Sequence, residues 1–98
     1  MKKIVVLNDA DNVATSLLAL DAGAEVTLTL AGETLTFNVR DAVPFGHKIA
    51  IRPMTAGEDV TKYGEVIGRA SRDVALGEWV HTHNVESARA RGDLADAS

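Results

Sequence analysis

The amino-acid sequence predicts a mainly β protein with one short helix (α+β), in which short strands are joined by sharp turns. Runs rich in Val, Ile, Leu and Thr recur along the 98-residue chain, a glycine-centred pattern is repeated, and a single stretch carries apolar residues at helical spacing. A chain of this length has little core to spare, so we expect one domain.

The N-terminal part of the chain contains the predicted helix. Residues 3–7 form a short β-branched run that predicts a strand, whereas residues 11–21 place apolar side chains at the spacing of a helix face. These side chains are Val13, Leu17, Leu18 and Leu20. Asp11 or Asn12 is a suitable N-cap, because a short polar side chain can accept a hydrogen bond from the first free N–H groups of a helix.

The rest of the chain predicts strands and turns. The expected strands cover residues 25–30, 33–39, 48–52 and 66–70, and the Ala31-Gly32 pair between the first two predicts a hairpin. A second pattern consists of an apolar residue, two residues, a glycine, two residues and another apolar residue. It occurs at residues 20–26, 43–49, 54–60 and 74–80. Because glycine adopts positive φ without a Cβ clash, each copy predicts a tight turn that leads into a new strand.

Composition and charge exclude several classes of partner. The net charge is −4 and the Lys and Arg residues are scattered, so we expect no nucleic-acid partner. The apolar run at the N-terminus is too short for a signal peptide and no stretch is long enough to span a membrane, so we expect a cytoplasmic protein with no membrane partner. Because the chain has no cysteine, a metal ion would be held by His, carboxylate or water, which favours Fe(II) or Mn(II) over a structural zinc.

Residues 85–98 differ in composition from the rest of the chain. They are polar, small and rich in Arg, with too few large apolar residues to anchor them in a core. We therefore divide the chain into a folded domain of residues 1–84 and a C-terminal tail of residues 85–98. The tail is expected to be mobile alone or ordered against a partner.

The first candidate for chemistry is the segment 77–84, which contains His81 and His83. If this segment is extended, both imidazoles emerge on one face roughly 6–7 Å apart and form half of a site for a divalent metal ion. The same spacing occurs freely in loops as two half-exposed polar residues, so it leaves both interpretations open. Trp79 lies on the same face, where it would stiffen the strand by packing.

A second candidate lies in the turn 43–50. His47 and Lys48 follow a turn glycine, and such a turn can present an imidazole, an ammonium and backbone N–H groups to a carboxylate. Arg52 would add a third positive group on the strand face of Lys48. An ordinary solvent-facing turn explains the segment equally well. Tyr63, next to Gly64, is open between a core position and a site position.

Four segments carry a more specific signal when they are taken in order. They are Asp11-Asn12-Val13-Ala14, Pro44-Phe45-Gly46-His47-Lys48-Ile49-Ala50, Lys62-Tyr63-Gly64-Glu65-Val66-Ile67-Gly68 and Gly77-Glu78-Trp79-Val80-His81-Thr82-His83-Asn84. Together they resemble the N-terminal SAF-type domain of the altronate dehydratase and galactarate dehydratase family. In that family the domain is fused to a large catalytic domain or forms a separate small subunit, and a free chain of this length resembles the second arrangement.

The resemblance implies a β-clip fold and the dehydration of a small anionic sugar acid, with water lost across C2 and C3 to give a 2-keto-3-deoxy acid. A divalent metal would stabilise the enediolate-like transition state. Within the matching segments we expect catalytic roles for His47 and Lys48, metal ligation by His81 and His83, and substrate binding by Asn84, Arg52 and Tyr63. The sequence does not tell a ligand from a base. Since two histidines cannot complete a metal site, the other ligands and the main base are expected from a large catalytic lyase subunit.

Two alternatives stay open. The domain also resembles the small subunit of sulfolactate sulfo-lyase, in which bisulfite is eliminated instead of water. It further resembles non-catalytic SAF modules of antifreeze, sialic acid synthase and pilus or flagellar assembly proteins. The alternating threonines of residues 27–36 do not favour an ice-binding surface, because ordinary strand preference explains them.

Overall fold

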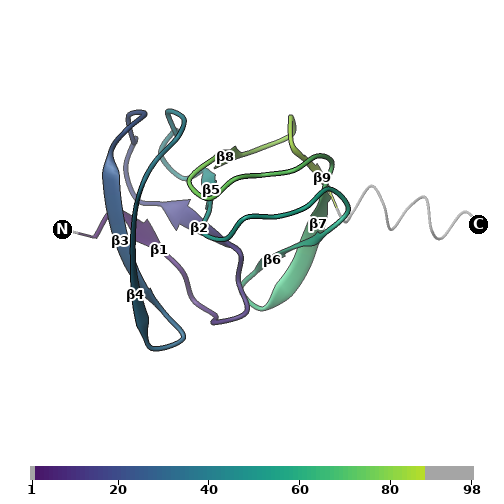
Figure 1. The fold of residues 1–98 in the computed structure, drawn as a ribbon, viewed down its shortest axis with the longest axis horizontal. Helices are drawn as coiled ribbons and strands as arrows, with labels where there is room; N and C mark the ends of the chain where they lie inside the picture. Colours follow the sequence, from purple (N-terminus) through teal and green to yellow (C-terminus); the bar gives the residue numbers. More distant parts are fainter. Residues whose placement is uncertain (1, 88–98) are drawn as a thin grey trace, which may run out of the picture.

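The computed structural model describes residues 2–87, and among these it contains nine strands and no helix. The strands are β1 (Ile4–Val5), β2 (Val13–Ser16), β3 (Glu25–Leu30), β4 (Glu33–Asn38), β5 (Lys48–Ala50), β6 (Asp59–Lys62), β7 (Glu65–Ala70), β8 (Trp79–Val80) and β9 (Val85–Ser87). They form three antiparallel sheets in the orders β1-β2-β5-β8, β3-β4 and β6-β7-β9. The four-stranded sheet lies between the other two (Figure 1). The prediction of a mainly β fold of short strands is confirmed, and none of the described residues forms a helix that could cross a membrane.

The predicted helix over residues 11–21 is wrong. Val13–Ser16 form β2, which pairs with β1 on one side and with β5 on the other, so that Val13 faces Ala50 in the register. Three of its four side chains are buried, which requires partners on both faces of the strand. A short apolar stretch satisfies the spacing of a helix and of a buried strand alike, and here the long-range pairing decides.

Asp11 and Asn12 fasten the loop before β2 to the hairpin of β6 and β7 instead of capping a helix. The buried carboxylate of Asp11 accepts the backbone N–H groups of Tyr63 at 3.0 Å and Gly64 at 2.8 Å. These two residues form the hairpin turn with positive φ angles of 56° and 76°. The amide of Asn12 accepts the N–H of Thr61 at 2.8 Å and donates to the carbonyl of Asp59 at 2.8 Å. The side chains therefore hold a turn that is strained for a non-glycine residue.

The four glycine-centred turns are confirmed. In each copy the glycine is the third residue of a β-turn, and its φ is between 82° and 92°. The turns lie in pairs, because Leu20 bridges Val43 and Met54 bridges Val74 through backbone hydrogen bonds of 2.8 Å. The apolar residues that begin and end every copy are buried. The predicted hairpin at residues 31–32 is also confirmed by the pairing of β3 with β4.

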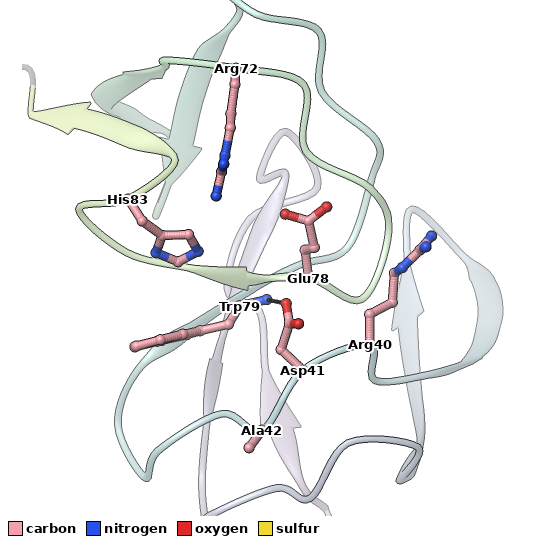
Figure 2. Close-up of a pocket in the computed structure, with 7 residues that line it drawn as sticks. All are labelled: Arg40, Asp41, Ala42, Arg72, Glu78, Trp79 and His83. Carbon is pink, nitrogen blue, oxygen red and sulfur yellow. Dashed lines mark hydrogen bonds between the residues drawn. The ribbon is translucent and has the colours of Figure 1, made fainter.

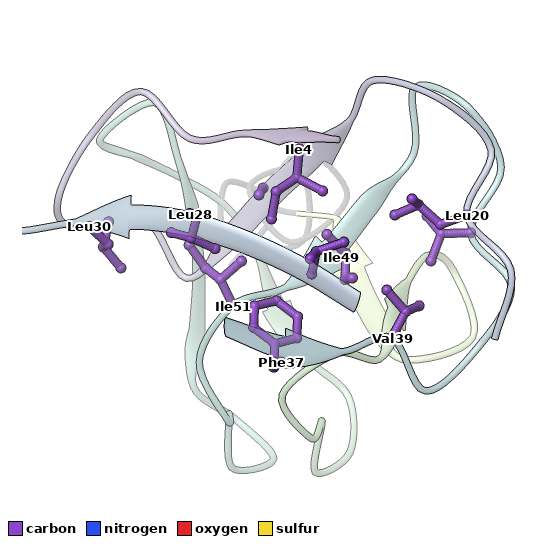
Figure 3. Packing of buried hydrophobic residues seen from close by; sticks show 11 residues of the cluster. Ile4, Leu20, Leu28, Leu30, Phe37, Val39, Ile49 and Ile51 are labelled. Carbon is purple, nitrogen blue, oxygen red and sulfur yellow. The ribbon is translucent and has the colours of Figure 1, made fainter. Parts of the chain in front are cut away.

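Two hydrophobic clusters form the core, and the pair of strands β5 and β8 contributes to both. The larger cluster contains Ile49 (Figure 3). Trp79 packs against this cluster. The smaller cluster contains Ala50 and Val80. Successive side chains of a strand point to opposite faces, so β5 and β8 serve both clusters in turn. His47 directly precedes β5 and is therefore next to a strand that contributes to both clusters.

The folded domain extends beyond the predicted boundary at residue 84. Val85–Ser87 form β9, which pairs with β7 through the register Gly68 with Ser87. The two strands approach so closely that a Cβ on Gly68 would collide with the backbone oxygen of Glu86. Residues 88–98, the remainder of the predicted tail, lie outside the described part of the chain.

Replacing Asp11 by Ala should lower the free energy of unfolding by about 3 kcal/mol, because two backbone N–H groups lose a charged acceptor in a buried position. Urea unfolding followed by circular dichroism measures the change. Asp9→Ala is the matched control, because exposed Asp9 accepts a single N–H from Ala31, and its loss should cost below about 1 kcal/mol. Equal costs for the two variants would contradict the role of Asp11.

Candidate functional site

All three histidines of the chain gather around its single tryptophan. The pairing of β5 with β8 places Ile49 opposite Trp79 and thereby brings the turn before β5 next to the end of β8. The ring centroid of Trp79 lies 5.8 Å from His47, 5.2 Å from His81 and 5.0 Å from His83. The rings of His47 and His81 are 5.0 Å apart. Two segments that the sequence presents as separate candidates thus form one cluster.

Trp79 is held by one hydrogen bond at its backbone and one at its indole ring. Its backbone N–H donates to a carboxylate oxygen of Asp41 at 3.1 Å, as Figure 2 shows. Its indole N–H donates to Nδ1 of His47 at 3.2 Å. Because an indole nitrogen is a donor only, Nδ1 of His47 carries a lone pair, and the proton of the neutral imidazole is on Nε2. The tautomer of His47 follows from this contact.

The segment that carries His81 and His83 is a turn, and the extended conformation expected for it is not found. Strand β8 ends at Val80, and the turn is closed by the backbone hydrogen bonds from the N–H groups of Asn84 and Val85 to the carbonyl of His81, at 3.1 and 3.0 Å. The two imidazoles do not share a strand face. Each of them packs against the ring of Trp79, with His81 nearly parallel to it and His83 tilted by 43°.

The side-chain contacts of Asn84 explain why β8 ends at Val80. Its side chain is fully buried, accepts the N–H of His81 at 2.9 Å and donates to the carbonyl of Trp79 at 2.8 Å. It also donates to Glu78 at 3.4 Å. These contacts hold the histidine turn in shape and occupy the amide of Asn84. Its expected contact with a substrate stays a prediction.

A first pocket lies on the His83 side of Trp79. This His83 pocket has a volume of about 620 Å³. Its lining residues are Arg40, Asp41, Ala42, Arg72, Glu78, Trp79 and His83. Arg72 extends toward the space between His83 and Glu78 (Figure 2). Two arginines and two carboxylates line the same space, so their formal charges balance.

A second pocket lies on the His81 side. This lysine pocket has a volume of about 430 Å³ and contains Lys48 and Lys62 together with His81 and Thr82. Burial lowers the pKa of Lys48 below its ordinary value of 10.5, and the positive charge of Lys62 lowers this pKa further, while Tyr63 opposes the shift. Among residues 2–87 neither lysine forms an ion pair. In the part of the chain that the structure describes, the lysine pocket therefore carries positive charge without a carboxylate in its lining.

The described residues do not complete a metal site. Within residues 2–87 no three His, Asp or Glu side chains are grouped closely enough to hold a metal ion. Nδ1 of His47 is already the acceptor of the Trp79 indole, which leaves only Nε2 for other contacts. The Fe(II) or Mn(II) expected from the sequence does not fit this chain alone.

The other two predicted site residues, Tyr63 and Arg52, lie in different parts of the structure. Tyr63 is 51% exposed, and its ring carries the ammonium of Lys62 at 4.8 Å, beside the lysine pocket. Arg52 is not on the strand face of Lys48, because β5 ends at Ala50. Its guanidinium donates to the carbonyl of Asp9 at 3.2 Å and lines another hollow, next to the β3–β4 hairpin.

Sequence reasoning missed Asp41, Lys62 and Arg72. Asp41 and Arg72 carry no local signal, because their roles depend on strands that are remote in the sequence. Lys62 stands beside Tyr63 in one of the matching segments, and a search for a second cation near Lys48 could have singled it out. The two lysines belong to different sheets, β5 and β6, and the packing that brings them into one pocket was not accessible from spacing.

Comparison with known proteins gives a consistent result. The profile of the altronate/galactarate dehydratase SAF domain matches residues 2–88. The (2R)-sulfolactate sulfo-lyase subunit alpha of Chromohalobacter salexigens is 41% identical over 90 residues, which cover 86% of this chain and 94% of that subunit. The altronate dehydratases of Bacillus subtilis and Escherichia coli are 32% and 40% identical over 89% and 79% of this chain. The matching regions make up only 17% and 15% of those two enzymes.

Replacing Lys48 by Met should raise the melting temperature at pH 7, because the charged form of Lys48 is disfavoured by burial and by Lys62. The unfolded chain binds the proton more tightly than the folded chain. The stability of the unchanged protein should therefore rise with pH from the lowered pKa up to about 10.5, and the gain from Lys48→Met should shrink over that window.

Thermal denaturation between pH 7 and pH 10 measures this effect of Lys48. Lys2→Met, at an exposed position, is the control and should leave the melting temperature nearly unchanged. A gain from Lys48→Met that is the same at every pH would show that the charge of Lys48 is not its source.

Proposed function

This chain belongs to the altronate/galactarate dehydratase SAF-domain family, and from that premise we propose that it is the small component of a lyase that acts on a 2-hydroxy acid together with a larger catalytic subunit. The observation that carries the proposal is the cluster of three histidines around Trp79 beside two lysines. Such a cluster offers acid–base groups on one surface, yet the described residues do not complete a metal site. A partial site of this kind is expected where a second chain supplies the rest.

Relatives of two lengths support a divided active site. The altronate dehydratases match this chain over about a sixth of their length, so most of each enzyme lies outside the shared region. The sulfo-lyase relative of nearly equal length is named as a subunit alpha. Both arrangements are those expected of a domain that works next to a larger catalytic part.

The proposed reaction begins with the C2 proton, which is weakly acidic because it lies next to the carboxylate. A base removes this proton, the C–H electrons form the C2=C3 double bond, and the leaving group departs from C3 with its electron pair. A departing hydroxide takes up a proton and leaves as water. The enol that remains tautomerises to a 2-keto-3-deoxy acid.

The geometry suggests different parts for His47 and Lys48. Since Nδ1 of His47 accepts the Trp79 N–H, its Nε2–H is the donor left for other contacts, which suits protonation of the leaving hydroxyl or a hydrogen bond to an oxyanion. Lys48 lines the lysine pocket beside His81, and its catalytic part would be to stabilise negative charge that develops on the substrate. The large subunit remains the proposed source of the main base.

The remaining expectations depend on the partner. His81 and His83 would each offer one imidazole to an Fe(II) or Mn(II) ion, and the other ligands would come from the large subunit. Tyr63 is the proposed substrate contact nearest to the lysine pocket, whereas Arg52 and Asn84 would need a rearrangement to reach it. The substrate proposed first is a sugar acid of the altronate or galactarate type.

A second candidate is the elimination of bisulfite from sulfolactate. It is favoured by one observation, namely that this chain covers 94% of the sulfolactate sulfo-lyase subunit alpha. The proton abstraction at C2 is the same, and the C3–S bond breaks instead of the C3–O bond. The two candidates differ in the leaving group and in the second anionic group of the substrate.

Co-expression of this chain with a large lyase subunit encoded beside it should give an active complex, and each chain alone should be inactive. Altronate, galactarate and sulfolactate are tested with Fe(II) and Mn(II), and the released keto acid or sulfite is measured. A His81→Ala, His83→Ala variant that still assembles should lose most of the activity. Full turnover by the isolated chain, or an assembled pair inactive on all three acids, would contradict the proposal.

Replacing Trp79 by Phe should allow both neutral tautomers of His47. The substitution keeps an aromatic ring in place and removes only the indole N–H that donates to Nδ1. The ¹⁵N chemical shifts of the His47 ring should change from a single Nε2–H tautomer to a mixture. The kcat of the complex should fall by about tenfold or more, with a smaller change in KM. Detection of the Nδ1–H tautomer in the unchanged protein would refute the assigned role.

A further inference from the structure

The lysine pocket has the features of a binding site for an anionic group. Its apolar lining residues are Ile67, Val80 and Val85, and its volume of about 430 Å³ lies in the range of pockets for small molecules. It opens where β5 and β8 of the central sheet approach β6, β7 and β9. His81 and Thr82 from the histidine turn stand at its side and add polar groups that are exposed to solvent.

Within residues 2–87, no acidic side chain lines this pocket. Lys48 and Lys62 are close enough for the charge of Lys62 to lower the pKa of Lys48, and neither lysine forms an ion pair within residues 2–87. The His83 pocket on the other side of Trp79 contains Asp41 and Glu78 beside its two arginines. Repulsion between two half-buried ammonium groups costs stability, and an anion between them would remove that cost.

Lys62 is held in position before any ligand arrives. Its ammonium lies over the ring of Tyr63 at 4.8 Å, a cation–π contact that restricts the flexible lysine side chain. Tyr63 in turn is fixed at positive φ by the carboxylate of Asp11. A side chain that is already ordered loses less entropy on binding, which favours affinity for a small ligand.

We propose that the lysine pocket binds an oxyanion of the substrate, a carboxylate or a sulfonate, between the ammonium groups of Lys48 and Lys62. The proposal rests on the lyase function above and deepens it, because it assigns substrate recognition to this small chain. The reacting carbons would then lie near His81 and His47, whose rings are 5.0 Å apart. The open side of the pocket is where the large subunit would complete the site.

Titrations of the isolated chain followed by ¹H–¹⁵N NMR test the proposal directly. Galactarate, altronate and sulfolactate are compared with the uncharged polyol galactitol, which has the carbon skeleton of galactarate without its carboxylates. The three acids should shift the signals of Lys48, Lys62, His81 and Thr82 at millimolar concentration, and galactitol should not. Lactate, which has the carboxylate of sulfolactate without its sulfonate, tells a sulfonate from a carboxylate as the preferred oxyanion.

Variants in the two pockets discriminate between them. Lys62→Met should weaken binding of the acids by about tenfold, the loss expected for one charge-assisted hydrogen bond. Arg72→Met changes the charge of the His83 pocket by the same amount and should leave the affinity within about twofold. A thermal melt of each variant verifies that the fold is intact.

Three results would overturn this inference. The first is a set of NMR shifts that centres on Arg40 and Arg72, and the second is equal binding of the acids and galactitol. The third is no binding of any acid up to the highest concentration at which it dissolves. Activity of the complex separates this inference from the proposed function. If Lys62→Met leaves the KM of an active complex unchanged, the oxyanion site is wrong and the lyase function stands.

Discussion

The need to place a glycine with positive φ in four turns constrains the whole architecture. These turns cut the chain into strands of two to six residues, which are too short to form a stable sheet alone. Stability comes from the association of turns in pairs and from the burial of the apolar residues that flank each of them. The site depends on the same constraint, because the turns at residues 43–49 and 74–80 lead into β5 and β8, and the pairing of those strands brings His47 to Trp79.

The turns could be predicted from the sequence because their requirement is local. The sequence shows four copies of a glycine between two apolar positions. The hairpin at Ala31-Gly32 also depends on a glycine that adopts positive φ. The strand β2 could not be predicted, because its short apolar run also fits a helix. Its nature is decided by β5, more than thirty residues away, and by the carboxylate of Asp11, whose acceptor role involves Tyr63 at a separation of 52 residues. Contacts at such distances leave no local pattern.

In the candidate site, too, local features could be predicted from the sequence and long-range contacts could not. The histidines were singled out from their neighbours in the sequence, but their arrangement around one indole depends on the register of β5 and β8. The side chain of Asn84 replaces the expected strand by a turn, and this turn separates His81 from His83 on the surface of Trp79. The result is a cluster of aromatic rings in which Trp79 and His83 line a pocket of balanced charge, while His81 lines a pocket that contains two lysines. In the function proposed above, the lysines would recognise the charge of the substrate and the histidines would transfer protons.

The position of Trp79 also makes the protein its own optical reporter. It is the single tryptophan of the chain, it stacks on one imidazole and donates a hydrogen bond to another, and it lines the His83 pocket. Indole emission responds to the polarity around the ring and to quenching by nearby protonated groups. Fluorescence from this one residue therefore arises at the candidate site alone, so that changes there can be followed in real time without any label.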